Sequence, residues 1–145
     1  MIEEKLFDDA KKSALNSLPV LFQNSFANAE LFELNAQNNL QNTENIYLLL
    51  SGFLHQEDSH NNCVRFMQNG DVLFTEKILS PSISTNNFIA LSDCVFLQIS
   101  LEKIRLDVQS NPLYHLDILN IVTKSLQIMD VLSANKITLP LKYQL

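Results

Sequence analysis

The feature that most constrains this chain is a series of short apolar segments, separated by polar turns, between about Ala29 and Ser100. Segments of this length are typical of β-strands, whereas an amphipathic helix needs a longer periodic stretch. Asn69-Gly70-Asp71 is the clearest turn signal in the chain. Many short strands with frequent turns favour a roll, a sandwich or a barrel. The apolar segments are 30–34, 46–50, 53–55, 63–67, 72–74, 88–91 and 95–99.

Helical patterns flank the predicted strands at both ends. Before the strands, apolar residues recur at helical spacing from Ile2 to Leu18, and Pro19 ends this pattern. After them, Ser100 is a suitable N-cap for a short helix over Leu101–Val108. We therefore predict a helix, a β-unit and then further helices, which is an α+β arrangement that is mainly β.

A long helix is predicted towards the C-terminus. Asn111-Pro112 is a strong start signal, and neither Gly nor Pro occurs from Leu113 to about Ala134. The helix carries two adjacent apolar stripes. The first stripe is Leu119, Val122, Leu126 and Met129, and the second is Ile118, Ile121, Ser125, Ile128 and Leu132. If the second stripe packs on the β-unit, the first is left to meet a second copy, so we predict a homodimer through the first stripe. The alternative is a helix buried on two sides within its own domain.

Length and charge narrow the class of protein. The 145 residues suffice for one domain, which we divide into an N-terminal helix (1–18), a β-unit with a short helix (19–110), the long helix (111–135) and a tail (136–145). The net charge of −6 disfavours binding to nucleic acid or to an anionic membrane. No apolar segment approaches the roughly 18 residues of a membrane span, and the acidic N-terminus does not resemble a secretory signal. We therefore expect a cytoplasmic protein.

No catalytic or metal-binding pattern stands out. The chain has only two glycines, which are too few for a glycine-rich phosphate loop. Its two cysteines are too few for a disulfide scaffold or for the ligands of an iron–sulfur cluster. His55, His60 and Cys63 are close in sequence, but a solvated loop around His60 is favoured over a metal site. Cys94 is expected to be a small core residue, with a redox switch at Cys63 or Cys94 as the alternative. We expect no enzyme activity, no cofactor and no metal.

Several short segments, in this order, carry a resemblance to a known family. Residues 46–52 read Ile-Tyr-Leu-Leu-Leu-Ser-Gly, residues 70–73 read Gly-Asp-Val-Leu, and residues 90–100 read Ala-Leu-Ser-Asp-Cys-Val-Phe-Leu-Gln-Ile-Ser. Asn111-Pro112 and Leu126-Gln127-Ile128 follow. The order resembles the effector domain of bacterial Crp–Fnr transcription regulators, a cyclic-nucleotide-binding-like domain. The resemblance implies a double-stranded, jelly-roll-like β-roll with a short N-terminal helix and a long C-terminal dimerisation helix.

The segment after the Gly-Asp turn departs from the phosphate cassette of that family. The resemblance implies a Gly-Glu pair near the ribose and an Arg on the cyclic phosphate, but residues 74–85 contain neither Gly nor Arg. Phe74 takes the place of the glycine, Glu76 aligns with the ribose carboxylate, and Lys77 is the only nearby cation. A buried phosphate needs cations and free N–H groups, so cyclic AMP is not expected to bind in the usual mode. The resemblance implies a weak pocket made of Leu73, Phe74, Glu76, Ser84, Thr85, Met129 and Asp130. Ser84 and Thr85 align with the Arg-Ser pair of the family's cassette, and Met129 and Asp130 align with the two ligand-facing hydroxyl residues of its long helix.

The resemblance implies a sensor and dimerisation domain of a transcription regulator. Its small-molecule effector is unidentified, and an uncharged or apolar ligand beside Leu73, Phe74 and Met129 is one alternative to cyclic AMP. Residues 135–145 are too few for a helix-turn-helix, so DNA binding is expected only if such a domain follows in the native protein. The competing hypothesis is a stand-alone β-roll that acts as an interaction or scaffold protein and has no DNA-binding activity of its own.

Overall fold

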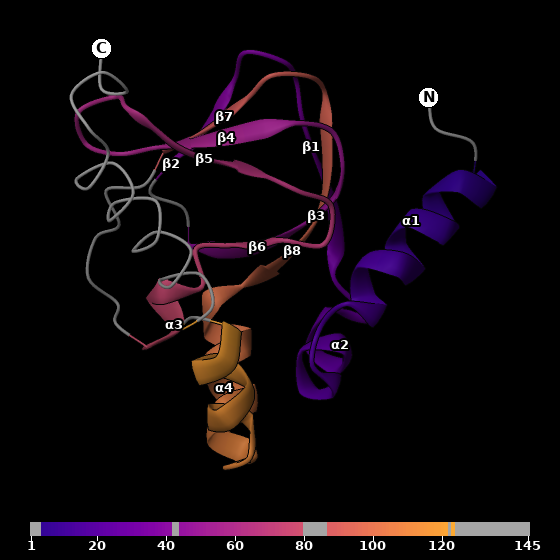
Figure 1. Ribbon diagram of the computed structural model, residues 1–145. Helices are drawn as coiled ribbons and strands as arrows, with labels where there is room; N and C mark the ends of the chain where they lie inside the picture. The colour runs from indigo at the N-terminus through magenta and orange to yellow at the C-terminus, as the bar shows by residue number, and fades with distance from the viewer. Residues whose placement is uncertain (1–3, 42–43, 80–86, 122, 124–145) are drawn as a thin grey trace, which may run out of the picture.

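Two antiparallel four-stranded sheets form the centre of the computed structural model, which describes residues 4–41, 44–79, 87–121 and 123 (Figure 1). The first sheet has the strand order β1-β8-β3-β6 and the second β2-β7-β4-β5. The strands are β1 (Glu30–Leu34), β2 (Asn39–Gln41), β3 (Asn45–Ser51), β4 (Leu54–Glu57), β5 (Cys63–Met67), β6 (Val72–Leu73), β7 (Asn87–Ala90) and β8 (Cys94–Ser100).

The described strands alternate between the two sheets along the chain. Among them only β4 and β5 are consecutive strands that pair with each other, and every other connection leads to the opposite sheet. This winding is the predicted β-roll, and the α+β fold class is confirmed. The seven predicted strands lie where the apolar segments predicted them. β2 was missed because its three residues contain a single apolar side chain, Leu40, which is too little for a period-two pattern.

Aromatic side chains from both sheets fill the space between them. Tyr47 on β3 packs edge-on against Phe96 on β8, with ring centroids 5.7 Å apart. Phe74, just after β6, packs edge-on against Phe88 on β7 at 5.0 Å. All four side chains are at most 2% exposed. Burial of each ring contributes about 1.5–3 kcal/mol. The first contact lies within one sheet, and the Phe74–Phe88 contact joins the end of β6 to β7 of the other sheet.

Two helices precede the strands, where one was predicted. α1 (Glu4–Asn16) ends before Leu18, and a second helix, α2 (Val20–Phe26), follows Pro19. Pro19 has φ −55° and ψ 150°, so it interrupts one helix and precedes the next. α2 escaped prediction because seven residues give too little periodicity. It buries Phe22 and Phe26 completely and contacts β8 and α4.

Two further helices, α3 (Glu76–Leu79) and α4 (Leu101–Ser110), follow β6 and β8. The N-cap of α4 is as predicted, because Ser100 Oγ accepts a hydrogen bond from the Lys103 N–H at 3.1 Å. After α4 the chain forms a turn at Asn111, whose side-chain and backbone oxygens accept from the Leu113 and Tyr114 N–H groups. Residues 114–121 are helical, so the helix begins two residues after Pro112.

The start of this helix has an inner and an outer face. Tyr114 and Ile118 are 2% and 0% exposed, whereas Leu119 is 48% exposed. Ile118 of the second predicted stripe is thus buried, and Leu119 of the first is exposed. Val122, Leu126 and Met129 lie outside the described residues, as do the rest of the long helix and the tail, so the dimer stays a prediction. In the part of the chain that is described, no helix is both long and apolar enough to span a bilayer.

Candidate functional site

The segment aligned with a phosphate cassette begins directly after β6. Phe74 there has φ +69°, a left-handed backbone conformation that glycine adopts most readily. The backbone at this position therefore has the shape expected of the glycine with which Phe74 aligns. The Phe74 side chain, however, is 1% exposed and its ring lies 5.0 Å from that of Phe88 and 6.1 Å from that of Tyr47. An aromatic ring thus occupies space next to a backbone turn that glycine would leave open.

Three cations of the described residues lie in this region, where one was predicted, and one of them is Arg105 on α4, whose guanidinium donates to the Lys77 carbonyl at 3.0 Å. Lys77 on α3 is 7% exposed, and its ammonium lies 5.0 Å from the centroid of the Phe74 ring, a cation–π arrangement. Arg65 on β5 is partly buried, and its Nε donates to Gln56 Oε1 at 3.1 Å. The expectation that Lys77 is the only nearby cation is therefore wrong.

Acidic groups of the turn and of α3 face Arg65. Burial lowers the pKa of the Arg65 guanidinium, and the charges of Asp71 and Glu76 oppose this shift. Arg65 is eleven residues before Glu76, so only the fold brings them together. A sequence signal existed, because Arg65 is the one charged residue in the apolar segment Cys63–Met67.

The predicted pocket residues fall into two groups. Leu73 and Phe74 are buried and Glu76 is partly buried at the start of α3. Ser84, Thr85, Met129 and Asp130 lie outside the described residues. The structure therefore brings together Leu73, Phe74 and Glu76 and adds Arg65, Gln56 and Lys77 to them.

Both cysteines and two of the histidines lie on β4, β5 and β8 and in the loop between β4 and β5. Cys94 is 1% exposed, which agrees with a small core residue, and burial raises the pKa of its thiol. Cys63 is exposed on β5. His55 Nε2 lies 2.9 Å from Glu57 Oε2, and His60 is exposed in the loop after β4. Across the described ranges, no three or more His, Cys, Asp or Glu side chains are placed to share a metal ion.

A second group of interest surrounds Tyr114, at the start of the C-terminal helical residues. Ser25 Oγ lies 2.5 Å from the Tyr114 hydroxyl and donates to Asp107 Oδ2 at 2.7 Å. The Phe22 ring packs edge-on against Tyr114 with centroids 5.1 Å apart. Desolvation raises the pKa of Tyr114 to about 12. These contacts tie helix residues 114–121 to both α2 and α4.

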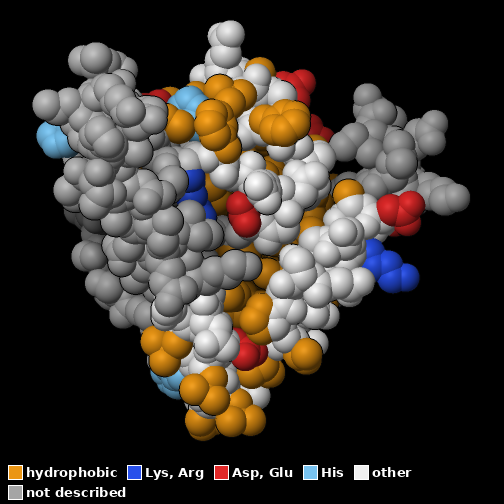
Figure 2. Space-filling model, in the orientation of Figure 1, with side chains coloured by type: hydrophobic (Ala, Val, Ile, Leu, Met, Phe, Trp, Pro, Cys, Tyr) orange, Lys and Arg blue, Asp and Glu red, His pale blue; other side chains and the backbone are white. Residues whose placement is uncertain are grey.

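Exposed leucines gather near the same helix. In Figure 2, hydrophobic side chains cluster at the lower end of the molecule, where α4 lies in Figure 1. The exposed leucines of α4 and of the residues after it are Leu106, Leu113, Leu116 and Leu119, which are 48–67% exposed. We call these four residues the leucine face. Of these four residues, only Leu119 belongs to the predicted dimer stripe, which begins at that residue.

Comparison with known proteins gives a fold but no sequence relative. No protein-family model and no curated protein matches this sequence. Among solved structures, a Geobacter metallireducens protein described as cyclic nucleotide-binding has a TM-score of 0.66 and 17% identity, covering 88% of this chain and 97% of its own.

Two transcription regulators show the same architecture. The Thermus thermophilus catabolite activator protein has a TM-score of 0.64 and 13% identity, over 78% of this chain and 57% of its own. The sensor domain of the Pseudomonas aeruginosa transcriptional regulator DNR has a TM-score of 0.63 and 13% identity, over 81% of this chain and 91% of its own. At these identities the likeness shows the fold alone. The chain thus has the β-roll fold found in cyclic nucleotide-binding and sensor domains of Crp/Fnr-type regulators.

Proposed function

We propose that this chain is the sensor and dimerisation domain of a Crp–Fnr-like transcription regulator and that it works in the cytoplasm without binding cyclic AMP in the usual mode. The observation that carries the proposal is Phe74, whose buried ring lies against Phe88 and Tyr47 at the position aligned with a cassette glycine. DNA contacts would come from a helix-turn-helix domain after the long helix. The fold supports a regulatory domain rather than an enzyme.

The charges near Phe74 also disfavour a bound cyclic phosphate. Arg65 is opposed by the carboxylates of Asp71 and Glu76, and Lys77 lies over the Phe74 ring. A buried phosphate must be met by cations that are not already neutralised, because removal of the anion from water costs several kcal/mol. A third cation, Arg105 on α4, donates to the Lys77 carbonyl at 3.0 Å. Each of these three cations already has a partner within the protein, so a nucleotide phosphate gains little there.

Thermal unfolding with added cyclic AMP tests this proposal. A ligand that binds only the native state raises the Tm with increasing concentration. We expect no increase with cyclic AMP at concentrations that stabilise a cyclic-AMP-binding regulator measured in parallel. A saturable increase, abolished by the Glu76→Gln substitution, would show that the cassette is functional.

An exposed apolar patch supports the second candidate, a stand-alone interaction protein. Phe53, Phe66 and Leu91 are 70%, 66% and 50% exposed, although large apolar side chains are usually buried. Phe53 and Leu91 are neighbours, because the Leu91 N–H donates to the Phe53 carbonyl at 2.8 Å. A patch of this kind suits a protein partner that does not depend on DNA.

The intact mass of the protein isolated from its own cells separates the two candidates. A mass well above 16.5 kDa, with sequence after Leu145, supports the regulator. A mass of 16.5 kDa supports the stand-alone protein, and the search then turns to partners of the Phe53 patch.

A further inference from the structure

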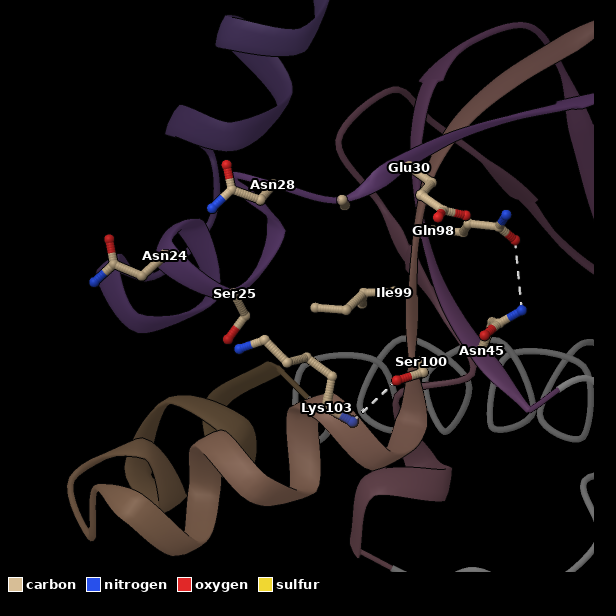
Figure 3. Close-up of a pocket in the computed structure, with 10 residues that line it drawn as sticks. Asn24, Ser25, Asn28, Glu30, Asn45, Gln98, Ile99, Ser100 and Lys103 are labelled. Atoms are coloured by element: carbon tan, nitrogen blue, oxygen red, sulfur yellow. Dashed lines mark hydrogen bonds between the residues drawn. The ribbon is translucent and has the colours of Figure 1, made fainter.

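A pocket of about 360 Å³ lies between α2, α4 and the adjoining ends of β1, β3 and β8 (Figure 3). Its polar side chains are already used within the protein, because Asn45 donates to Gln98 at 3.4 Å and Ser25 donates to a carboxylate of α4 at 2.7 Å. Figure 3 shows Asn24 and Asn28 pointing away from the cavity. The lining therefore favours no class of ligand over another.

The two sheets differ in what covers their outer faces. On the first sheet, α1 contacts β3 and α2 contacts β8 (Figure 1). Tyr47 and Phe96 point into the roll, so their neighbours Leu48 and Leu97 point outwards, and these leucines are at most 1% exposed beneath the helices. No described helix makes more than marginal contact with β2, β4, β5 or β7. Among the described elements, the second sheet thus lacks the helical layer that covers the first.

The pairing of β4 with β5 and β7 brings large apolar side chains together on the outer face of the second sheet. Leu54 and Met67 pair with each other and are at most 2% exposed, so they point into the roll. Because side chains alternate along a strand, their neighbours Phe53 and Phe66 point outwards, and these rings are 70% and 66% exposed. The Leu91 N–H donates to the Phe53 carbonyl at 2.8 Å, which places Leu91 opposite Phe53. We call Phe53, Phe66 and Leu91 the Phe53 patch.

His55 and Ile89 make the Phe53 patch continuous. They lie opposite each other on β4 and β7, and the His55 ring packs edge-on against Phe66 with centroids 6.2 Å apart. Figure 2 shows hydrophobic side chains gathered at the upper end of the molecule, where these strands lie in Figure 1, with acidic side chains beside them. An apolar sheet face is normally buried against another layer, as α1 and α2 bury the outer face of the first sheet.

Carboxylates flank the Phe53 patch at both ends. Glu57 lies two residues beyond His55 on β4, and its carboxylate is 2.9 Å from His55 Nε2. Asp58 follows in the next loop, and the exposed Asp93 lies two residues after Leu91. These side chains contribute three formal negative charges around an apolar centre.

The lysines and arginines of the described residues lie elsewhere. The lysines are on α1, α3 and α4, and Arg105 is on α4. Arg65 adjoins Phe66 in sequence but points to the opposite face of β5, where its Nε donates to the buried Gln56 at 3.1 Å. The leucine face differs, because α4 carries Lys103 and Arg105 close to it. Charge complementarity therefore favours a basic partner at the Phe53 patch and not at the leucine face.

We propose that the Phe53 patch binds an amphipathic helix of a partner protein, whose apolar side chains are flanked by lysine or arginine. The apolar side chains of that helix cover the patch, and its cations approach the three carboxylates. The proposal rests on the interaction function given above as the second candidate and adds the chemistry of the partner. The intact mass decides whether the protein stands alone, and the titration below decides what the patch binds, so the two can fail separately.

Nuclear magnetic resonance titration of the full chain with a synthetic peptide tests the proposal. The probe is an amidated peptide of roughly 14 leucines and lysines, with the leucines three and four residues apart so that they form one helical face. We expect it to shift the amide signals of Phe53, Phe66 and Leu91. The same peptide with glutamate in place of lysine should bind at least about tenfold more weakly, because several charge pairs change sign.

Three results of this titration would overturn the proposal. The first is no shift at the Phe53 patch, or shifts confined to the leucine face. The second is equal binding of the lysine and glutamate peptides. The third is a concentration-dependent shift of the patch signals without peptide, which would make the patch an interface between two copies of this chain.

Two pairs of variants separate the apolar contribution from the charge. Leu91→Ser should weaken binding of the lysine peptide about fivefold, whereas Leu31→Ser on β1 should not, although Leu31 and Leu91 are 52% and 50% exposed. Asp93→Asn should weaken it about twofold, whereas Asp9→Asn at an exposed position of α1 should leave it unchanged. Equal effects within both pairs contradict binding at the Phe53 patch.

Discussion

The backbone at Phe74 illustrates how single residues set the character of the roll. A bulky residue at φ +69° costs about 1–2 kcal/mol relative to an ordinary conformation. Complete burial of a phenyl ring contributes about 1.5–3 kcal/mol. The ring contacts with Phe88 and Tyr47 therefore offset the strain, and the protein retains a glycine-like turn while the space beside it is filled.

Gly52 and Gly70 also have positive φ, of 107° and 94°, but only one of them is surrounded by backbone. A Cβ at Gly52 would lie 2.5 Å from the Asp93 carbonyl oxygen, whereas one at Gly70 would meet the Ser17 side chain at 2.9 Å, which can rotate away. We expect Gly70→Ala to lower the free energy of unfolding by about 1 kcal/mol, because alanine is strained at a positive φ, and Gly52→Ala to lower it by about 3 kcal/mol. Urea denaturation of both variants measures the difference, and equal losses would contradict the contact at Asp93.

Tyr114 makes the free energy of unfolding depend on pH in the alkaline range. Desolvation raises its pKa from 10 to about 12 in the folded protein, so the unfolded chain loses this proton first. Its contribution is complete below pH 10 and is lost as the pH rises towards about 12. We expect the urea midpoint of wild type to fall more steeply across this range than that of Tyr114→Phe. Parallel curves for the two proteins would refute this assignment.

At the scale of elements, α4 has the clearest start. Ser100 Oγ accepts from the Lys103 N–H, and loss of such a cap costs about 1 kcal/mol. Ser110, at the other end of α4, donates only to the Leu106 carbonyl one turn earlier. Ser100→Ala should therefore reduce the free energy of unfolding by about 1 kcal/mol, and Ser110→Ala by less than half of that. Thermal unfolding of the pair checks this order.

The helices differ in how well local sequence predicted them. The sequence predicts α4 because the N-cap residue Ser100 precedes apolar residues at helical spacing. Asn111-Pro112 correctly predicts that another helix begins nearby. α2 is too short for its periodicity to be seen, and Pro19 marks the end of one helix as readily as the start of the next. The burial of Phe22 and Phe26 against β8 and α4 stabilises this short helix, which its seven residues alone would not.

At the scale of the whole molecule, the leucine face predicts self-association. Leu119 is 48% exposed although its neighbour Ile118 is fully buried. In a dimer, Leu119→Asp would bury an unpaired carboxylate in each copy and raise the dissociation constant by at least about a hundredfold, or ~3 kcal/mol. Sedimentation velocity should show a dimer for wild type and monomers for Leu119→Asp.

Asn120→Asp supplies the matched control, because Asn120 is an exposed neighbour and gains the same charge. It should leave the dimer intact. A monomeric wild type, or a dimer that persists in Leu119→Asp, would remove the predicted interface.

The sequence by itself determined the order of most elements, because their signals are local. Apolar segments of strand length, the turn at Asn69-Gly70-Asp71 and the cap at Ser100 each depend on a few adjacent residues. The same locality allowed the absence of Gly and Arg from residues 74–85 to be seen without coordinates.

Only the tertiary structure decided which distant side chains meet. Arg65 on β5 approaches Glu76 on α3, and Ser25 reaches Asp107 and Tyr114 over 82 and 89 residues of chain. Such contacts depend on packing and on the winding of the strands, which no local pattern encodes. The pocket beside Ser25 and the leucine face became visible for the same reason: exposure and hydrogen bonding belong to the folded surface rather than to any segment.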